Sequence, residues 1–371
     1  MAIVVPTFRP RLPTAETLLP FLHEIDEHRW YSNFGPLNRR FESALAAHFQ
    51  APQGTVVTVA NATLGLTLAL QDAAQGRAGL CMVPAWTHAA SASAIVAAGL
   101  TPWFVDVEPQ SWQLTPAAAR RLLETAPERP QAILPVSPFG DLVDPEAWDR
   151  YTGDTGIPVV IDAAAAFDAV RPARATVQVV SLHATKAFGI GEGGLMLAGD
   201  ERRADRLRRM SNFGFDRDRT SVRPGTNAKL SEYAAAVGLA ALGGWPAART
   251  QLIAAARRFL AGLAAVSEVV PMPALDRAIA TSTANVILPD RNADAVIRFL
   301  RDRGIEARKW WAGACHRHKQ FAACPRTSLA VSEDLADRVL GLPFFADITD
   351  EQLQLVFDGL RAALARRLEP A

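Results

Sequence analysis

Short apolar segments alternate with helix-like segments through the first half of the chain, and this alternation limits the fold more than any other feature. The segments that read as strands are Thr55–Ala60, Gly79–Pro84, Pro102–Val107, Gln131–Val136 and Ile157–Ile161. Helical patterns such as Thr87–Ala98 and Thr115–Thr125 lie between them. Because strands that alternate with helices usually pair in parallel, we expect an α/β fold with a mainly parallel sheet covered by helices on both faces.

The second half of the chain contains a long alanine- and leucine-rich helical pattern, Ser231–Leu242 followed by Pro246–Leu263. We expect it to lead from a large domain, residues 1–244, into a smaller C-terminal α+β domain, residues 245–371. The smaller domain would contain the strand-like segment Ala284–Leu288, the helix Ala293–Arg303 and the amphipathic helix Asp350–Arg366. The apolar residues of that last helix recur at helical spacing and indicate core positions.

One lysine follows an apolar strand pattern and precedes a glycine-rich turn. Residues 179–186 read Val-Val-Ser-Leu-His-Ala-Thr-Lys, residues 189–194 read Gly-Ile-Gly-Glu-Gly-Gly, and Lys186 is the only lysine between residues 1 and 228. The pattern from Thr176 to Ala198 predicts strand, turn and strand. Burial lowers the pKa of a lysine, and the neutral amine can form a Schiff base with a carbonyl. The alternative is a surface lysine at the end of a hairpin.

A carboxylate ends the buried-strand pattern that lies 24 residues before this lysine. Asp162 follows the apolar run Ile157–Ile161, which places it at the carboxyl edge of the predicted sheet, where α/β proteins bind ligands. Pyridoxal phosphate (PLP) enzymes need a lysine that binds the cofactor covalently and a carboxylate that keeps its pyridine nitrogen protonated. Lys186 and Asp162 fit these two roles. Asp162 could also be a helix N-cap before the four alanines that follow it.

A strand that passes directly into a helix supplies a candidate phosphate site. The strand Thr55–Ala60 is followed by the helical pattern Asn61–Leu70. The amides of Ala62 and Thr63 would open that helix, where free N–H groups and the helix dipole favour a phosphate dianion. The alternative is ordinary helix capping by Asn61. The pattern favours a phosphate site mainly because it precedes Asp162 and Lys186 in the chain.

Five motifs in this order resemble the DegT/DnrJ/EryC1/StrS family of sugar aminotransferases, within the fold-type I PLP enzymes. The resemblance rests on residues 83–88 with 97–107, 160–164, 181–186 with 191–194, 212–215, and 225–232. The most specific of these is Ser-Leu-His-Ala-Thr-Lys followed by Gly-Glu-Gly-Gly. The resemblance implies a PLP-dependent transaminase with a large cofactor-binding domain and a smaller C-terminal domain.

The resemblance also implies roles for individual residues in cofactor binding. Lys186 would hold PLP as a Schiff base, and Asp162 would pair with the pyridinium nitrogen. Ser181, Ala62 and Thr63 would surround the phosphate. His88 stands where the family usually has an aromatic ring on the cofactor face, and an imidazole can stack there with less contact area.

Asn227 corresponds to a family residue that reaches the phosphate in the neighbouring subunit. The resemblance therefore implies a homodimer in which two chains share each active site. Two positions depart from the family pattern. Ala165 stands where the family commonly has Gln, and Ala62 stands where it usually has Gly before Thr63. Both departures bear on cofactor contacts and substrate preference more than on the reaction class.

The implied reaction moves an amino group onto a nucleotide-linked keto-sugar, with glutamate as the expected donor. Our best candidate for the acceptor is a dTDP-linked 4-keto-6-deoxyhexose, and 3-keto sugars and cyclitols remain open. Asn33, within a Ser-Asn-Phe-Gly-Pro segment similar to one in the family, is a candidate substrate residue. His316 is a second candidate, because family members often carry a His in the segment that returns to the active-site mouth.

The composition is typical of an enzyme and argues against nucleic-acid binding. The chain has 371 residues, 49% of them hydrophobic, and a formal net charge of +1. Its apolar stretches are too short for a membrane span, and its first residues show no signal-peptide pattern, so we expect a cytoplasmic protein. The chain has only three cysteines, a small and odd number that argues against a disulfide framework. Cys315, His316, His318 and Cys324 match no common zinc spacing, and we expect no metal.

Two other classes of protein were weighed against the aminotransferase. The glycines at residues 189–194 could suggest a nicotinamide-binding Rossmann protein, but that fingerprint should follow the first strand and open a helix. Here the glycines come late and precede the apolar strand pattern Leu195–Ala198. A non-catalytic binding module on the same fold would be expected to lose the Schiff-base lysine, and Lys186 is present.

Overall fold

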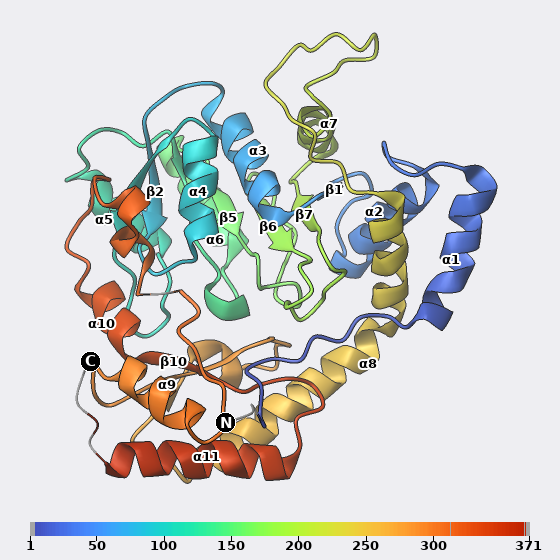
Figure 1. Ribbon diagram of the computed structural model, residues 1–371. Helices are drawn as coiled ribbons and strands as arrows, with labels where there is room; N and C mark the ends of the chain where they lie inside the picture. The colour runs from blue at the N-terminus through green and yellow to red at the C-terminus, as the bar shows by residue number, and fades with distance from the viewer. Residues whose placement is uncertain (1–3, 312, 367, 369–371) are drawn as a thin grey trace.

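A seven-stranded sheet forms the centre of the larger part of the molecule (Figure 1). The computed structural model describes residues 4–311, 313–366 and 368, so the ends of both predicted domains lie outside the described residues. The strands follow the spatial order β3-β2-β4-β5-β6-β7-β1. Their bounds are β1 Val56–Val59, β2 Leu80–Pro84, β3 Thr101–Val105, β4 Ala132–Ile133, β5 Val160–Asp162, β6 Val177–Ser181 and β7 Gly194–Leu197.

The sheet is mainly parallel, as the alternation of strands and helices predicts. β3, β2 and β4 pair in parallel, as do β5 and β6, and single bridges from Ile133 to Val159 and from Val136 to Asp162 join β4 to β5. β7 runs antiparallel to both β6 and β1. Because only twelve residues separate β6 from β7, the link is too short to hold the helix that a parallel return needs.

Neighbouring residues of each strand face two separate apolar cores, one on each side of the sheet. Val57 and Val179 join the core beneath helices α3 (Ala62–Ala74), α4 (Ala89–Ala97) and α7 (Glu201–Met210). Val56 and Val180 join the opposite core. That core packs against α2 (Pro36–Phe49), α5 (Pro116–Leu123), α6 (Pro145–Thr155) and the first half of α8. The helices therefore cover both faces, as expected.

β4 is shorter than the predicted strand Gln131–Val136. Pro135 has no N–H to donate, so the ladder with β2 is interrupted after Ile133. The chain nevertheless stays in line with the sheet, because the Asp162 amide donates to the Pro135 carbonyl at 2.9 Å and the Ser137 amide donates to the Asp162 carbonyl at 2.9 Å. This segment holds the end of β5 from one side.

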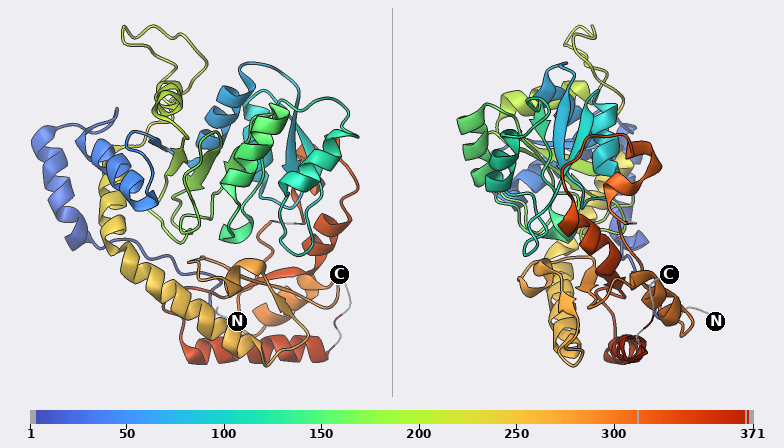
Figure 2. Two further views of the ribbon diagram at one scale, coloured as in Figure 1. Left: turned by 180° about the vertical axis from the view of Figure 1, so that it is seen from behind. Right: turned by 90° about the vertical axis from the view of Figure 1, so that its left-hand side faces the viewer.

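Helix α8 (Glu232–Leu263) is one continuous helix that joins the two segments of the predicted helical pattern, Ser231–Leu242 and Pro246–Leu263. Pro246 lies inside it, and Gly243 and Gly244 precede the proline in the turn where its ring would crowd the backbone. Figure 2 shows α8 running from the sheet to the C-terminal elements. The predicted boundary between residues 244 and 245 therefore falls inside a helix, and the division into domains stays a prediction.

The C-terminal elements form a small antiparallel sheet with helices packed on it. Its strands are β8 (Val270–Pro271), β9 (Ala284–Ile287) and β10 (Val339–Leu342), in the order β10-β9-β8. The helices are α9 (Ala293–Arg301), α10 (Ala330–Arg338) and α11 (Asp350–Ala365), and α1 (Ala15–His28) lies near the N-terminus. Within the described residues, we find no helix whose length and apolar character would let it cross a membrane.

Candidate active site

Lys186 lies in the turn between β6 and β7, and the backbone of that turn is held by its own hydrogen bonds. The amides of Leu182 and Ala184 donate to the carbonyls of Gly193 and Gly191, and the Lys186 amide donates to His183. Gly191 has a φ of +102°, which suits glycine. The glycines therefore close a tight hairpin between antiparallel strands, in agreement with the predicted strand, turn and strand.

Asp162 lies at the end of β5, and its carboxylate is fixed by two hydrogen bonds. The Ser91 hydroxyl donates to Oδ2 at 2.6 Å, and the Ala164 amide donates to Oδ1 at 3.1 Å. Ser91 in turn lies 2.7 Å from the Thr87 hydroxyl, and all three side chains are buried. Ser91 was not predicted from the sequence. Its only sequence signal is its position four residues after Thr87, which lies just before the cap of α4.

The Asp162 carboxylate is close enough to the Lys186 amine to act on the pKa of the lysine. Burial lowers the pKa of Lys186 below its ordinary value, and the negative charge of Asp162 opposes that shift. Part of the lysine side chain is exposed, yet burial of the amine is the larger of these two effects. A lysine with a lowered pKa can act as a nucleophile and as a base.

His88 caps the N-terminus of α4 and belongs to the same cluster. Its Nδ1 accepts a hydrogen bond from the Ala90 amide at 3.2 Å, so the neutral ring carries its proton on Nε2. His88 is exposed at the surface of the chain, yet desolvation lowers its pKa. The positive charge of Lys186 lowers it further, Asp162 opposes the shift, and His318 also lowers it. His88 is thus placed beside Lys186 and Asp162, as its motif position implies.

The N-terminus of α3 has the free amides that a phosphate site requires. Asn61 caps this helix and accepts from the Leu64 amide at 2.9 Å, while the amides of Ala62 and Thr63 have no acceptor within the helix. A Cβ atom on Gly194 of β7 would lie 2.6 Å from the Ala62 nitrogen, so only glycine allows this close approach. Ser181 ends β6 next to Gly194, its partner in the ladder. We call Asp162, Lys186, His88, Ser181 and the α3 N-terminus the sheet-edge site.

Asn227 lies at the base of an extended loop, residues 211–230, that projects from the body of the molecule (Figure 2). It forms a bridge with Asn212 and is exposed. The Lys229 ammonium donates to the Asn212 side chain at 2.9 Å, and the Ala228 carbonyl accepts from the Ala60 amide at 2.8 Å. These contacts bring the Asn227 backbone next to the end of β1. The role of Asn227 in a partner subunit stays a prediction.

The two substrate candidates lie outside the cavity beside Lys186. Asn33 is exposed in the link between α1 and α2 and has a φ of +60°. His316 is buried, with Nε2 3.2 Å from Glu333 and its ring edge against Phe104. His316 therefore packs inside the protein. The substrate roles of Asn33 and His316 stay predictions.

The segment that contains Trp311 and Cys315 packs against the turn that carries His88. The Cys315 amide donates to the Ala85 carbonyl at 2.8 Å, and Trp311 packs against Trp86 and stacks on Phe139. The positive charge of His318, two positions after the predicted His316, also acts on the pKa of His88. Among the described residues, no group of three or more His, Cys, Asp or Glu side chains could hold a metal ion. The cysteines are free thiols.

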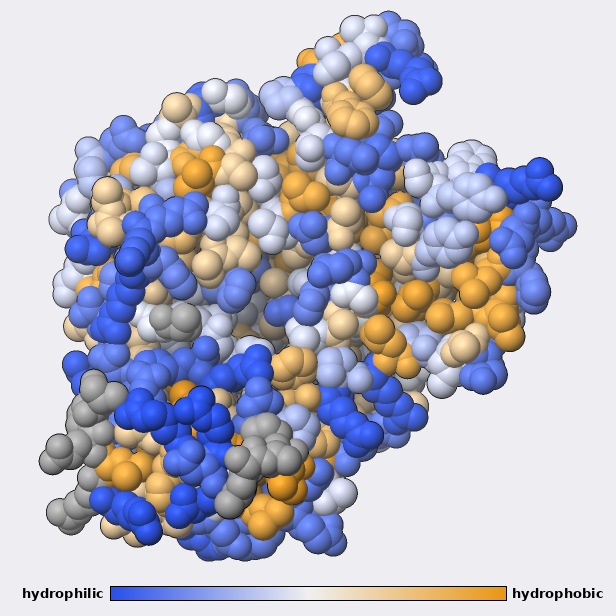
Figure 3. Space-filling view, in the orientation of Figure 1, coloured by the Kyte–Doolittle hydropathy of each residue, from blue (hydrophilic) through white to orange (hydrophobic). Residues whose placement is uncertain are grey.

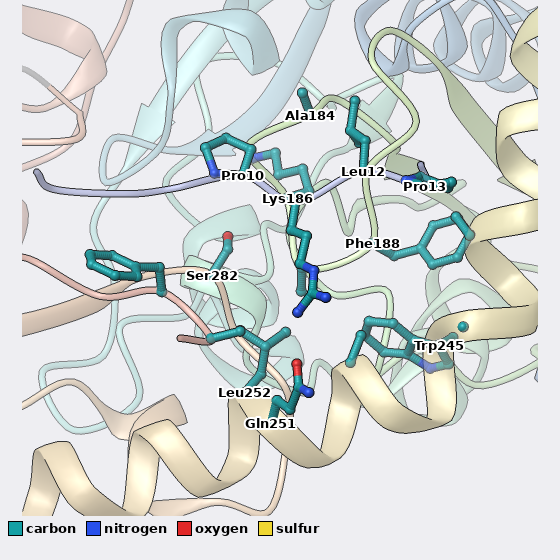
Figure 4. Close-up of a pocket in the computed structure, with 18 of the residues that line it drawn as sticks. Pro10, Leu12, Pro13, Ala184, Lys186, Phe188, Trp245, Gln251, Leu252 and Ser282 are labelled. Atoms are coloured by element: carbon teal, nitrogen blue, oxygen red, sulfur yellow. The ribbon is translucent and has the colours of Figure 1, made fainter. Parts of the chain in front are cut away.

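A cavity of about 330 Å³ opens beside the Lys186 turn (Figure 4). It is bounded by the N-terminal segment 8–14, the Lys186 turn 184–189, the middle of α8, Ser282 and residues 344–346. Figure 4 shows Pro10, Leu12 and Pro13 across one side and Trp245, Gln251 and Leu252 of α8 on the other. We call this space the strap cavity and residues 8–14 the strap. It meets the sheet-edge site at Lys186.

The sequence matches the profile of the DegT/DnrJ/EryC1/StrS aminotransferase family over residues 14–361. The chain belongs to this family. It is a PLP-dependent sugar aminotransferase with the fold-type I architecture. The nicotinamide-binding and non-catalytic interpretations are therefore set aside.

The chain is similar to named sugar transaminases and to solved aminotransferase structures. The dTDP-3-amino-3,4,6-trideoxy-alpha-D-glucose transaminase of Streptomyces venezuelae is 31% identical, covering 94% of this chain and 92% of the relative. A putative PLP-dependent aminotransferase from Bacillus cereus has a TM-score of 0.91 and 30% identity, covering 96% of this chain and 99% of the other. DesI, solved in the presence of its TDP-sugar product, has a TM-score of 0.85 and 31% identity, covering 99% and 94%.

Proposed function

We propose that this aminotransferase moves an amino group from glutamate to a nucleotide-linked keto-sugar, with a dTDP-linked 4-keto-6-deoxyhexose as the best candidate acceptor. The observation that carries the proposal is that the Lys186 amine lies within the electrostatic influence of the hydrogen-bonded Asp162 carboxylate at the sheet edge. Such a pair is what PLP transamination requires of a protein. The acceptor class is supported by the printed activity of the Streptomyces relative.

The residues of the sheet-edge site fit PLP. We assign Lys186 as the covalent attachment point, Asp162 as the partner of the ring nitrogen, and His88 as the residue beside the ring. The free amides of Ala62 and Thr63, with the Ser181 hydroxyl nearby, would hold the phosphate. When bound, PLP supplies an electron sink for the bond changes at the substrate carbon. The fit rests on the close approach of Gly194 to the α3 N-terminus, which keeps those amides uncovered.

Each residue of the pair has a separate task in the transfer. The lowered pKa of Lys186 lets its amine accept a proton from the substrate carbon and later return one, as a general base and acid. Asp162 stays in place because Ser91 and Ala164 donate to its two oxygens. A carboxylate fixed in this way holds positive charge on a neighbouring nitrogen. Ala165, in place of the Gln common in the family, offers no polar side chain, so it adds nothing to this network.

We also propose a cytoplasmic homodimer in which Asn227 reaches the site of the partner. Apolar side chains gather over α1 and the first half of α8 (Figure 3). Leu19 of α1, Tyr233 of α8, and Trp30 and Tyr31 in the link after α1 are each more than 40% exposed. An apolar surface of this kind is typical of protein interfaces. Free thiols fit a reducing compartment.

A two-step experiment tests the proposed function. The PLP-loaded protein is first mixed with glutamate alone, and loss of the visible absorbance of lysine-bound PLP reports the donor step. A dTDP-linked 4-keto-6-deoxyhexose is then added, and mass spectrometry detects the aminated sugar. If glutamate leaves the absorbance unchanged, the donor assignment is wrong. If the donor step occurs but no nucleotide-linked keto-sugar is aminated, the acceptor class is wrong.

A further inference from the structure

The strap cavity is lined by positive side chains and by no acidic ones. Arg9, Arg11 and Lys186 line it, and its described lining residues include no Asp or Glu. A concave site with charges of one sign concentrates ligands of the opposite sign. Both substrates of the proposed function carry negative charge, as carboxylates in the amino donor and as a diphosphate in the nucleotide-linked acceptor.

The two arginines of the strap differ in their partners. Arg9 lies 3.4 Å from Asp347, so part of its charge is already matched. Arg11 forms no ion pair and no side-chain hydrogen bond with any described residue of the chain, and it is exposed. A guanidinium has a planar fork of donors that suits two oxygens of a carboxylate or phosphate. Arg11 is therefore the cation of this cavity that is available to a ligand.

A second, independent observation indicates a polar ligand in the same space. Trp245 lines the cavity and is buried, yet its indole N–H has no hydrogen-bond partner among the described residues. Gln251 and Ser282 also line the cavity, and their side chains form no hydrogen bonds within the described part of the chain. Buried donors normally have partners, so an unsatisfied one at a cavity wall suits a ligand or a water molecule.

From these observations we propose that Arg11 binds an anionic oxygen group of a substrate in the strap cavity and thereby sets substrate affinity. The inference rests on the proposed function, because that function brings the substrate to Lys186, which borders the cavity. The group is either a carboxylate of the amino donor or a phosphate of the acceptor. Both present a pair of oxygens to the same guanidinium, and the experiment separates them.

The test uses the PLP-loaded protein and two unreactive probes. Glutarate stands for the donor carboxylates and dTDP for the acceptor diphosphate, and calorimetry measures the affinity of each. The variants are Arg11→Gln and Arg11→Lys, with Arg202→Gln on the exposed face of α7 as the matched control, because Arg202 also has no ion pair among the described residues. We expect Arg11→Gln to weaken one probe by about ten- to a hundredfold, the range for a charged hydrogen bond, and Arg11→Lys to weaken it less.

The probe that loses affinity identifies the group that Arg11 binds. The proposal is overturned if Arg11→Gln and Arg202→Gln bind both probes within twofold of each other. It is also overturned if Arg11→Gln loses its PLP, because Arg11 would then support the cofactor and not the substrate. Failure of the proposed function gives a different result, in which the wild-type protein does not respond to glutamate or to the keto-sugar.

Discussion

The sheet-edge site and the strap cavity meet at Lys186 but are built in opposite ways. The sheet-edge site consists of strand ends and a helix N-terminus, and its carboxylate is buried under hydrogen bonds from Ser91 and Ala164. The strap cavity is walled by segments far apart in the sequence, with exposed residues in the strap and buried ones in α8, and its polar side chains have few partners. The difference indicates that the sheet positions the residues of the reaction. The strap cavity, which contacts the substrate in our proposal, can change in sequence without disturbing the sheet.

Replacing Lys186 is the strongest test of the role assigned to the sheet-edge site. We expect Lys186→Ala to reduce turnover by about a thousandfold or more, because the amine is both the attachment point and the proton carrier. The measurement is amino-sugar formation with glutamate, together with the visible absorbance of the purified protein. Lys319→Ala, at an exposed lysine outside both regions, should keep both signals. Full turnover by Lys186→Ala would refute the assignment of the sheet-edge site.

Asp162→Asn should have the next largest effect. The amide keeps the shape of the side chain but cannot hold positive charge on the ring nitrogen, so we expect a roughly hundredfold loss of kcat. Binding of PLP should persist, because the lysine and the α3 amides are unchanged. The surface variant Asp205→Asn, in an exposed pair with Arg209, should match the wild type in rate. Equal rates for Asp162→Asn and the control would show that the carboxylate does no chemistry.

Gly194→Ala tests the backbone of the sheet-edge site. The added Cβ would lie 2.6 Å from the Ala62 nitrogen, so the α3 N-terminus must shift. We expect a loss of ~1–3 kcal/mol in the free energy of unfolding and weaker PLP binding. Gly153→Ala in α6 is the matched control, since nothing lies within 4 Å of its added Cβ, and it should gain ~0.5–1 kcal/mol. Denaturant unfolding and PLP titration measure both.

His88 gives the smallest expected effect, on the pH dependence of stability. Its pKa is lowered in the folded state from the ordinary value of 6.5, so the unfolded chain binds the proton more readily. The free energy of unfolding should therefore fall as the pH falls below 6.5. His88→Phe should make this fall shallower, while His48 and His316, whose pKa values are also lowered, preserve part of it. An unchanged slope in urea midpoints from pH 7 to pH 5 would contradict this account of His88.

The sequence predicted the sheet and the sheet-edge site because their signals are local. The segment Ile157–Ile161 is a continuous apolar run that ends directly before Asp162, and Lys186 lies between the apolar strand pattern that ends near Leu182 and the glycine-rich turn. Ser91 was missed because its role depends on how α4 packs against β5.

The strap cavity could not be predicted from the sequence, and neither could the continuity of α8. Arg11, Gln251 and Ser282 come together only through long-range packing, and none stands in a motif. A proline inside a helix removes an amide and crowds the preceding turn, so the sequence pattern alone does not predict that the helix continues through Pro246. The structure shows that two glycines and packing on both sides keep that helix intact.

The N-terminal segment is hydrogen-bonded to the C-terminal elements before it crosses the strap cavity. Val5 bridges to Ile305, the Thr7 amide donates to Glu306 at 2.9 Å, and the Phe344 amide donates to the Thr7 carbonyl at 2.9 Å. The strap is thus tethered at residues 4–7 and again where α1 packs on α8. Deleting the residues before residue 8 would remove one of these two attachments. We therefore expect shortened forms to bind vitamin B6 with normal affinity and their substrates with lower affinity.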